Sequence, residues 1–184
     1  MVGSEQTSGE HVSELDEAWA LALAEAEARA RVAGRGDLAE YLALRNSNDL
    51  LRKTGIDWLF QTFTELAGLA NRTGSMIQIA TVDGHRFRVG TATMVGRLLT
   101  LKSGVRTLMI EAGWPRTPRD GFIRGGGLAC ASVRHVGIAP ASRQLLLIKA
   151  QTGIPEWKVV DQSKSHLDEA AVHAHLEILV DRQE

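Results

Sequence analysis

The period at which apolar residues recur changes near residue 75, and this change constrains the fold more than any other feature of the chain. Before residue 75, apolar residues return every three or four positions, as they do on one face of a helix. After it, short runs with alternating apolar and polar residues end at glycine, which is typical of strands joined by turns. The sequence therefore predicts the α+β class, with helices first and an antiparallel sheet after them.

About three helices are predicted in the N-terminal part, over residues 13–33, 38–53 and 58–72. Each begins at or directly after a Ser or Asp that can cap its first turn, and Gly34 marks the end of the first helix. The apolar stripe of the first helix consists of Leu15, Trp19, Ala22, Ala26, Ala30 and Ala33. Because most of these side chains are alanine, the stripe is thin and suits close packing against another helix or a partner protein.

A meander of six or seven strands is predicted to follow the helices. In the first hairpin, a three-residue loop at residues 82–84 pairs Ile79 with Phe87 and keeps the apolar pairs on one face. In the second hairpin, the chain turns at residues 102–104 and pairs Leu101 with Val105. Later strands are predicted within residues 127–137, 143–150 and 156–161, and a final helix from about residue 167 to residue 180.

The order of a helix, a twisted meander and an Asp-Gly turn resembles that of small SH3-like or Sm-like barrels over about 40 residues. The resemblance implies a partial barrel as an alternative to an open meander, and it implies no activity, because such sheets host many unrelated functions. We expect a polar tail at residues 1–12, a helical region at residues 13–72, and a β domain with its C-terminal helix at residues 75–184.

Composition excludes several classes of protein. No apolar run approaches the roughly 18 residues that a membrane span needs, and the N-terminus lacks the basic and apolar regions of a secretory signal. Cys130 is the only cysteine, so an intramolecular disulfide and a multi-cysteine metal site are both excluded. We expect Cys130 to be buried and inert, on the opposite strand face from His135. A cytoplasmic protein without membrane contact fits these features.

Charge is segregated along the chain, although the net charge is only -1. Residues 1–41 carry 3 basic and 9 acidic side chains, whereas residues 72–150 carry 12 basic and 3 acidic ones. Two arrangements fit this pattern: the acidic helices neutralise the basic sheet, or the sheet presents an open basic surface to an anionic partner. The pI of about 6.6 favours the first, since dedicated nucleic-acid-binding domains have a pI above about 9.

The segment GWPRTPRDGFIRGGG, residues 113–127, is the candidate ligand site, because so long a connection is uncommon in a compact domain unless it is functional or mobile. Its candidate binding residues are Trp114, Arg116, Arg119, Phe122, Arg124, Gly125, Gly126 and Gly127. In this hypothesis the arginines pair with phosphates and an aromatic ring stacks on a base. The alternative is an ordinary loop with solvated arginines and a local Pro-Arg-Asp-Gly turn.

Motifs for catalysis or metal binding are absent from the sequence. There is no GxSxG, no HExxH and no phosphate-binding P-loop. His166, Glu169, His173 and Glu177 lie along one side of the final helix, but such ladders are common on solvated faces, so neither a metal nor another cofactor is predicted. His175 is expected to be partly buried, with a hydrogen bond, rather than a ligand.

The sequence favours a non-enzymatic cytoplasmic module, an accessory or regulatory protein that acts through protein–protein contacts. The helix of residues 13–33 is the expected contact, with a partner protein or with a second copy of the chain. The alternative is binding of an anionic ligand, a nucleic acid or a nucleotide-like molecule, by the loop of residues 113–127. An enzyme of unidentified type centred on that loop is the third hypothesis.

Overall fold

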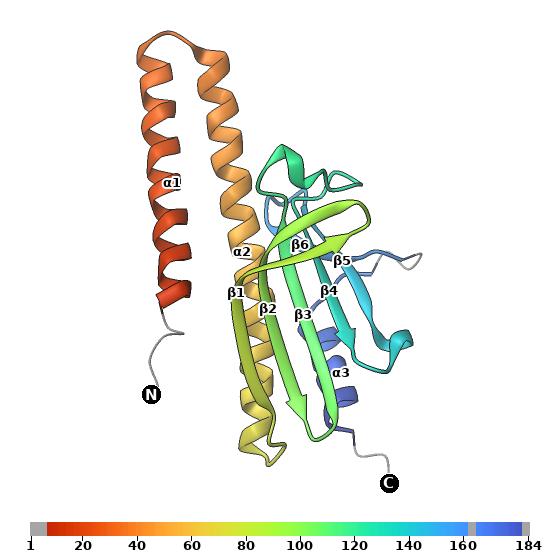
Figure 1. Cartoon of the computed structure of the whole chain (residues 1–184). Helices are drawn as coiled ribbons and strands as arrows, with labels where there is room; N and C mark the ends of the chain where they lie inside the picture. Colours follow the sequence, from red (N-terminus) through yellow and green to blue (C-terminus); the bar gives the residue numbers. More distant parts are fainter. Residues whose placement is uncertain (1–6, 162–164, 182–184) are drawn as a thin grey trace. The chain divides into compact units, whose positions relative to one another are not determined.

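The structure is a computed structural model that describes residues 7–161 and 165–181 (Figure 1). Its elements are α1 (Thr7–Val32), α2 (Gly36–Arg72), β1 (Gln78–Val89), β2 (Ala92–Ser103), β3 (Arg106–Trp114), η1 (Pro118–Asp120), β4 (Ala129–His135), η2 (Ala139–Ala141), β5 (Arg143–Lys149), β6 (Pro155–Val159) and α3 (Glu169–Val180). These elements confirm the α+β class, the antiparallel meander and the C-terminal helix. Residues 1–6 of the predicted polar tail lie outside the described residues.

The N-terminal part contains two long helices, so the prediction of about three is wrong. α1 ends as predicted, because Gly34 has a φ of +69° and the Arg35 N–H donates to the Ala30 carbonyl at 2.9 Å, as in a Schellman motif. α2, in contrast, continues through the predicted break before Asp57. The Asp57 carboxylate accepts a hydrogen bond from Arg97 of β2 at 2.5 Å instead of capping a helix.

The chain divides into two compact units, residues 1–53 and residues 54–184, and the division falls inside α2. In the first unit, α1 and the first part of α2 form a helical hairpin. Leu23, Ala30 and Ala39 are its buried apolar side chains among those described. The second unit contains the rest of α2, the sheet and α3.

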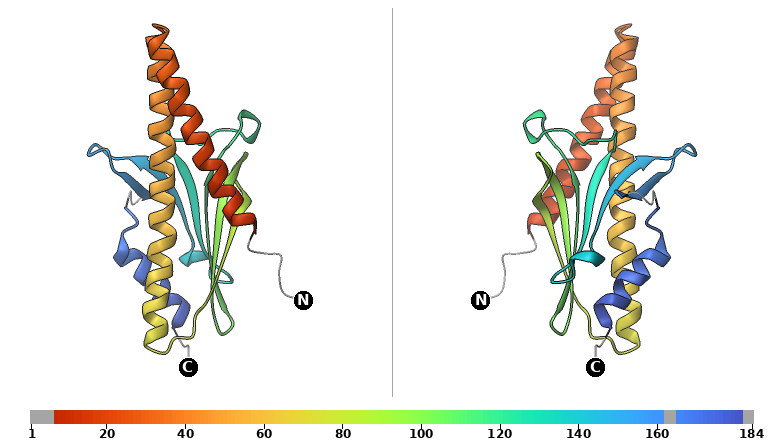
Figure 2. Two further views of the ribbon diagram at one scale, coloured as in Figure 1. Left: turned by 90° about the vertical axis from the view of Figure 1, so that its left-hand side faces the viewer. Right: turned by 90° about the vertical axis from the view of Figure 1, so that its right-hand side faces the viewer.

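The six strands form one antiparallel sheet in chain order, from β1 at one edge to β6 at the other (Figures 1 and 2). A barrel would require the two edge strands to pair with each other. Within the described residues β1 pairs with β2 and β6 with β5, so the sheet is not closed. The structure therefore supports the meander, and the described strands form no closed barrel.

The first hairpin turns seven residues later than its Asp-Gly sequence predicts. β1 continues through the predicted loop and the chain reverses at Gly90, so Phe87 pairs with Met94 and not with Ile79. Gly84 does adopt a positive φ of +67°, but it does so in a β-bulge inside β1. A bulge and a tight turn both favour glycine in this conformation, so the local sequence does not distinguish them.

The second hairpin is close to its predicted position but has a different register. The chain turns at Gly104 and Val105, and Leu101 therefore pairs with Leu108 instead of Val105. This two-residue connection leaves Val105 exposed and buries Leu101 and Leu108 completely.

The last part of α2 and α3 lie against the same face of the sheet and form the main core with it (Figure 2). The largest completely buried side chains of this core are Leu59, Phe63, Leu99, Leu101, Leu108, Ile110, Val133, Leu145, Leu147, Val172 and Leu179. Two polar contacts fix the helices in place: Trp157 Nε1 donates to the Gly55 carbonyl at 2.8 Å, and Arg106 donates to the Ile178 carbonyl. In the described part of the chain, no helix is both long and apolar enough to cross a membrane.

A smaller hydrophobic cluster occupies part of the opposite face. It contains Phe87, Ala92, Met94 and Cys130, and Ile123 of the connection between β3 and β4 packs against it. The prediction that Cys130 is buried is confirmed, and burial raises the pKa of its thiol to about 11. The candidate ligand loop is thus attached to the sheet through Ile123.

Candidate functional site

The predicted turn at the centre of the candidate loop is present as η1. Both the backbone N–H and the hydroxyl of Thr117 donate to Asp120 Oδ2, at 3.0 and 2.9 Å. Arg86 of β1 donates to Asp120 Oδ1 at 2.9 Å. The hydrogen bond from the Thr117 side chain is the main reason why the pKa of Asp120 lies below its ordinary value. This carboxylate neutralises part of the basic character that the sequence assigned to the loop.

The three arginines of the loop have different surroundings. The Arg116 guanidinium lies 3.7 Å from the centre of the Trp114 ring, so these two side chains form a cation–π pair. Arg119 and Arg124 are exposed, and neither has an ion-pair or hydrogen-bond partner within the described residues. Phe122 between them is 82% exposed. Three of the predicted binding residues are therefore available to a ligand without the loss of a hydrogen bond or ion pair within the described residues.

The glycine run has a structural explanation. Gly125 and Gly126 have φ values of +81° and +71°, which the turn into β4 requires. A Cβ atom on Gly127 would lie 2.2 Å from Leu146 Cδ1, so a larger residue at this position would have to displace the Leu146 side chain. The run therefore does not by itself indicate a phosphate cradle.

Within the second unit, α3 does not neutralise the basic sheet. Arg106 contacts α3 through a backbone carbonyl, and Arg143 donates to the carbonyls of Pro140 and Ser142. Arg97 is the sheet arginine that pairs with a helix carboxylate among the described residues, and that carboxylate belongs to Asp57 of α2. Much of the positive charge of the exposed arginines on and near β1 is thus not neutralised by helix carboxylates.

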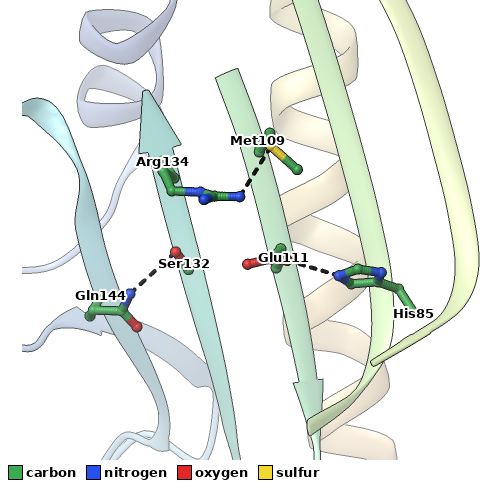
Figure 3. Close-up of polar contacts among 6 residues, drawn as sticks. All are labelled: His85, Met109, Glu111, Ser132, Arg134 and Gln144. Atoms are coloured by element: carbon green, nitrogen blue, oxygen red, sulfur yellow. Dashed lines mark hydrogen bonds and ion pairs between the residues drawn. The ribbon is translucent and has the colours of Figure 1, made fainter. Parts of the chain in front are cut away.

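A row of polar side chains, which we call the polar row, crosses the sheet face away from α2 and α3 (Figure 3). It consists of His85, Glu111, Ser132 and Gln144. His85 Nε2 lies 2.8 Å from Glu111 Oε1, and Gln144 Nε2 donates to Ser132 Oγ at 3.2 Å. Glu111 and Ser132 are directly paired across β3 and β4, and Arg134 in the next row donates to Met109 Sδ.

The hydrogen bonds of the polar row do not form a catalytic triad. They join His85 to Glu111 and Ser132 to Gln144, whereas a nucleophilic serine needs the imidazole as its own partner. The polar row was not predictable from local sequence because it depends on the register of neighbouring strand pairs. The one local indication of the polar row is that Glu111 alternates with buried neighbours in β3.

A buried pair of histidines lies in the main core, between the sheet and α3. His135 Nε2 and His175 Nδ1 are 3.0 Å apart, and the two rings stack with their centres 5.2 Å apart. Burial, reinforced by the neighbouring His135 and by Arg143, lowers the pKa of His175 to about 4. The prediction of a buried, hydrogen-bonded His175 is confirmed, and the pair is a structural element of the core.

The histidines on the outer side of α3 and before it form separate contacts. His173 Nδ1 lies 3.3 Å from Glu177 Oε1, and His166 Nδ1 lies 3.3 Å from Glu156 Oε2. Among the described residues, no three side chains of His, Cys, Asp or Glu come together as a metal-binding group.

Comparison of the chain with protein-family models, with curated proteins and with solved structures gave no match.

Proposed function

We propose that the protein is a non-enzymatic binding module whose helical hairpin contacts another protein chain. The main observation in support is the exposure of large hydrophobic side chains on the hairpin. Their exposed fractions range from 50% for Trp19 to 91% for Val32. These side chains are Trp19, Leu21, Val32, Tyr41, Leu44 and Leu50. A contact with another chain would remove this apolar surface from water, which favours association.

The internal packing of the hairpin supports this proposal. Leu23, Ala30 and Ala39 are its buried apolar residues in the described part, and two of the three are alanine. So small an interface buries little apolar area, and most of the stability of helices in proteins comes from the packing of such an apolar face. A partner that covers the exposed side chains would therefore stabilise the hairpin as well as bind it.

Three of the exposed hydrophobic side chains come together on one part of the hairpin surface. Tyr41 and Leu44 are three residues apart and lie on the same side of α2. Arg45 extends over the Trp19 ring at 5.2 Å from its centre, which brings Trp19 of α1 beside this part of α2. We call Trp19, Tyr41 and Leu44 the hairpin patch, and aromatic side chains of this kind are enriched at the centres of protein interfaces.

Site-specific photo-crosslinking tests the proposal. A photo-reactive phenylalanine analogue at Leu44 should give a discrete crosslinked product with a second copy or with a partner protein, whereas the same group at Leu69 should give none. Leu69 is a matched control because it is 48% exposed and lies on α2 in the second unit. Tyr41→Glu should remove the Leu44 product without changing the melting temperature of the second unit. Equal crosslinking at both positions would contradict the proposal.

Binding of an anionic ligand by the loop of residues 113–127 is the second candidate function. Exposed Arg119 and Arg124 beside exposed Phe122 favour it, because guanidinium groups pair with phosphates and aromatic rings stack on bases. Titration with labelled oligonucleotides should then give a log affinity that falls by about 0.7 to 0.9 per log unit of salt for each phosphate contact. Arg119→Ala and Arg124→Ala should each reduce this slope, and Arg72→Ala, at an exposed arginine outside the loop, should not.

A further inference from the structure

A pocket of about 410 Å³ lies in the second unit, on the helix side of β6. Three segments far apart in the sequence line it: residues 54–58 of α2, residues 154–157 at the start of β6, and residues 166–169 at the start of α3. Its volume falls in the range of about 300–1,000 Å³ that is usual for sites that bind small molecules. None of the hydrogen bonds or ion pairs of the hairpin or of the polar row involves these residues.

Two tryptophans form much of the apolar wall of the pocket. The Trp157 ring is buried, and the hydrogen bond from its Nε1 to the Gly55 carbonyl at 2.8 Å fixes its orientation. Trp58, one turn further along α2, also lines the pocket and is 39% exposed. Leu167 and Pro155 complete this wall. The pocket therefore offers aromatic surface and aliphatic side chains to an apolar group.

The charged side chains that line the pocket are acidic. Glu156, Asp168 and Glu169 line it together with His166, whose Nδ1 lies 3.3 Å from Glu156 Oε2, and neither Lys nor Arg does. Asp168 Oδ1 accepts a hydrogen bond from the Ala171 N–H as the N-cap of α3, which leaves Oδ2 for other partners. The Glu169 carboxylate is exposed and has no partner within the described residues. The positive end of the α3 dipole equals only about half a charge, so three carboxylates leave the pocket negative.

We propose that this pocket binds a small organic cation, a primary or quaternary ammonium with an apolar body. An ammonium group is attracted both by carboxylates and by the face of an indole ring, and the pocket combines the two. The apolar body would lie against Trp58 and Leu167. The charge would face Glu169 and Glu156 Oε1, because Glu156 Oε2 already lies beside His166. An anion of the same shape would meet three carboxylates, so charge is the main basis of selection.

Three probes of one shape test the proposal: 2-phenylethylammonium, 2-phenylethanol and 3-phenylpropanoate. The full-length protein, labelled with ¹⁵N, is titrated with each, and the indole N–H signals of Trp58 and Trp157 are followed by NMR. We expect the ammonium probe to shift both signals with saturation, the alcohol to bind about tenfold more weakly, and the carboxylate not to bind. Equal binding of the ammonium and the alcohol, or unshifted signals at millimolar ammonium probe, would overturn the proposal.

Charge-removing variants separate the pocket from general electrostatic attraction. Glu169→Gln and Glu156→Gln should each weaken binding of 2-phenylethylammonium severalfold, and Trp58→Leu should do the same by removing the aromatic face. Glu177→Gln is the matched control, since it removes a carboxylate from α3 outside the pocket. An unchanged melting temperature shows that a variant is folded. Losses of equal size in Glu169→Gln and Glu177→Gln would refute the specific site. The result does not depend on the hairpin, so either proposal can fail alone.

Discussion

α2 lies close to Leu147 of β5 at Gly55, and replacement of Gly55 by alanine should destabilise the second unit. A Cβ atom at residue 55 would lie 2.6 Å from Leu147 Cδ1 and 2.8 Å from Leu147 Cδ2. Leu147 is completely buried, so its methyl groups have no free space to move into. Such overpacking costs about 1–3 kcal/mol, whereas alanine in place of glycine inside a helix gains about 1 kcal/mol. We therefore expect Gly55→Ala to lose about 1 kcal/mol.

Gly68→Ala is the matched control in the same helix. Its Cβ would meet nothing closer than Arg72 Nη1 at 4.0 Å, so the gain in helix propensity should remain, and stability should rise by about 0.5–1 kcal/mol. Urea unfolding followed by tryptophan fluorescence in a Trp19→Phe background measures the difference between the two variants. Leu147→Val should relieve part of the loss in Gly55→Ala. If Gly55→Ala were as stable as Gly68→Ala, the close contact would not be real.

Three further predictions concern the core and the loop. The pKa of about 4 for His175 lies below the value of about 6.5 in an unfolded chain, so the unfolded state binds the proton first, and stability should fall by up to ~3 kcal/mol as the pH drops from 6.5 toward 4. His175→Leu should flatten this dependence in urea midpoints measured at pH 7, 6 and 5. Trp157→Phe removes the indole N–H that donates to the Gly55 carbonyl and should cost about 0.5–1.5 kcal/mol, measured by thermal unfolding. Gly127→Ala should lower the melting temperature because its Cβ atom would collide with Leu146, and a second change, Leu146→Ala, should restore it. If the double variant recovers its stability and binds oligonucleotides with unchanged affinity, the glycine run is not a phosphate cradle.

Local patterns in the sequence predict those features that depend on neighbouring residues alone. The helix end at Gly34, the burial of Cys130 and the hydrogen-bonded His175 all agree with the structure. Each of them follows from a residue type combined with the period of its own element. The later strands and the last helix were predicted correctly for the same reason.

Features that depend on distant residues were not predictable in this way. Asp57 is a residue type that commonly caps a helix. In the structure its carboxylate accepts a hydrogen bond from Arg97, 40 residues away, and the helix continues. The sequence around Gly84 predicts a turn, and only the position of the partner strand shows that Gly84 forms a bulge. The polar row and the pocket each combine three or more segments of the chain. Their prediction requires the register of the sheet and the docking of both helices, and no local sequence pattern indicates either.

The residues that stabilise the second unit and the residues that support the proposed protein contact belong to different parts of the chain. All of the largest completely buried side chains lie between Leu59 and Leu179, whereas the hairpin patch lies between Trp19 and Leu44. Mutations that only destabilise a fold usually act through its buried core. Loss of binding in a hairpin-patch variant can therefore be assigned to the contact itself when its second unit melts normally and its helix content, measured by far-UV circular dichroism, is unchanged. The exposed arginines of the loop allow the same inference, because substitution of Arg119 or Arg124 removes no hydrogen bond or ion pair within the described residues.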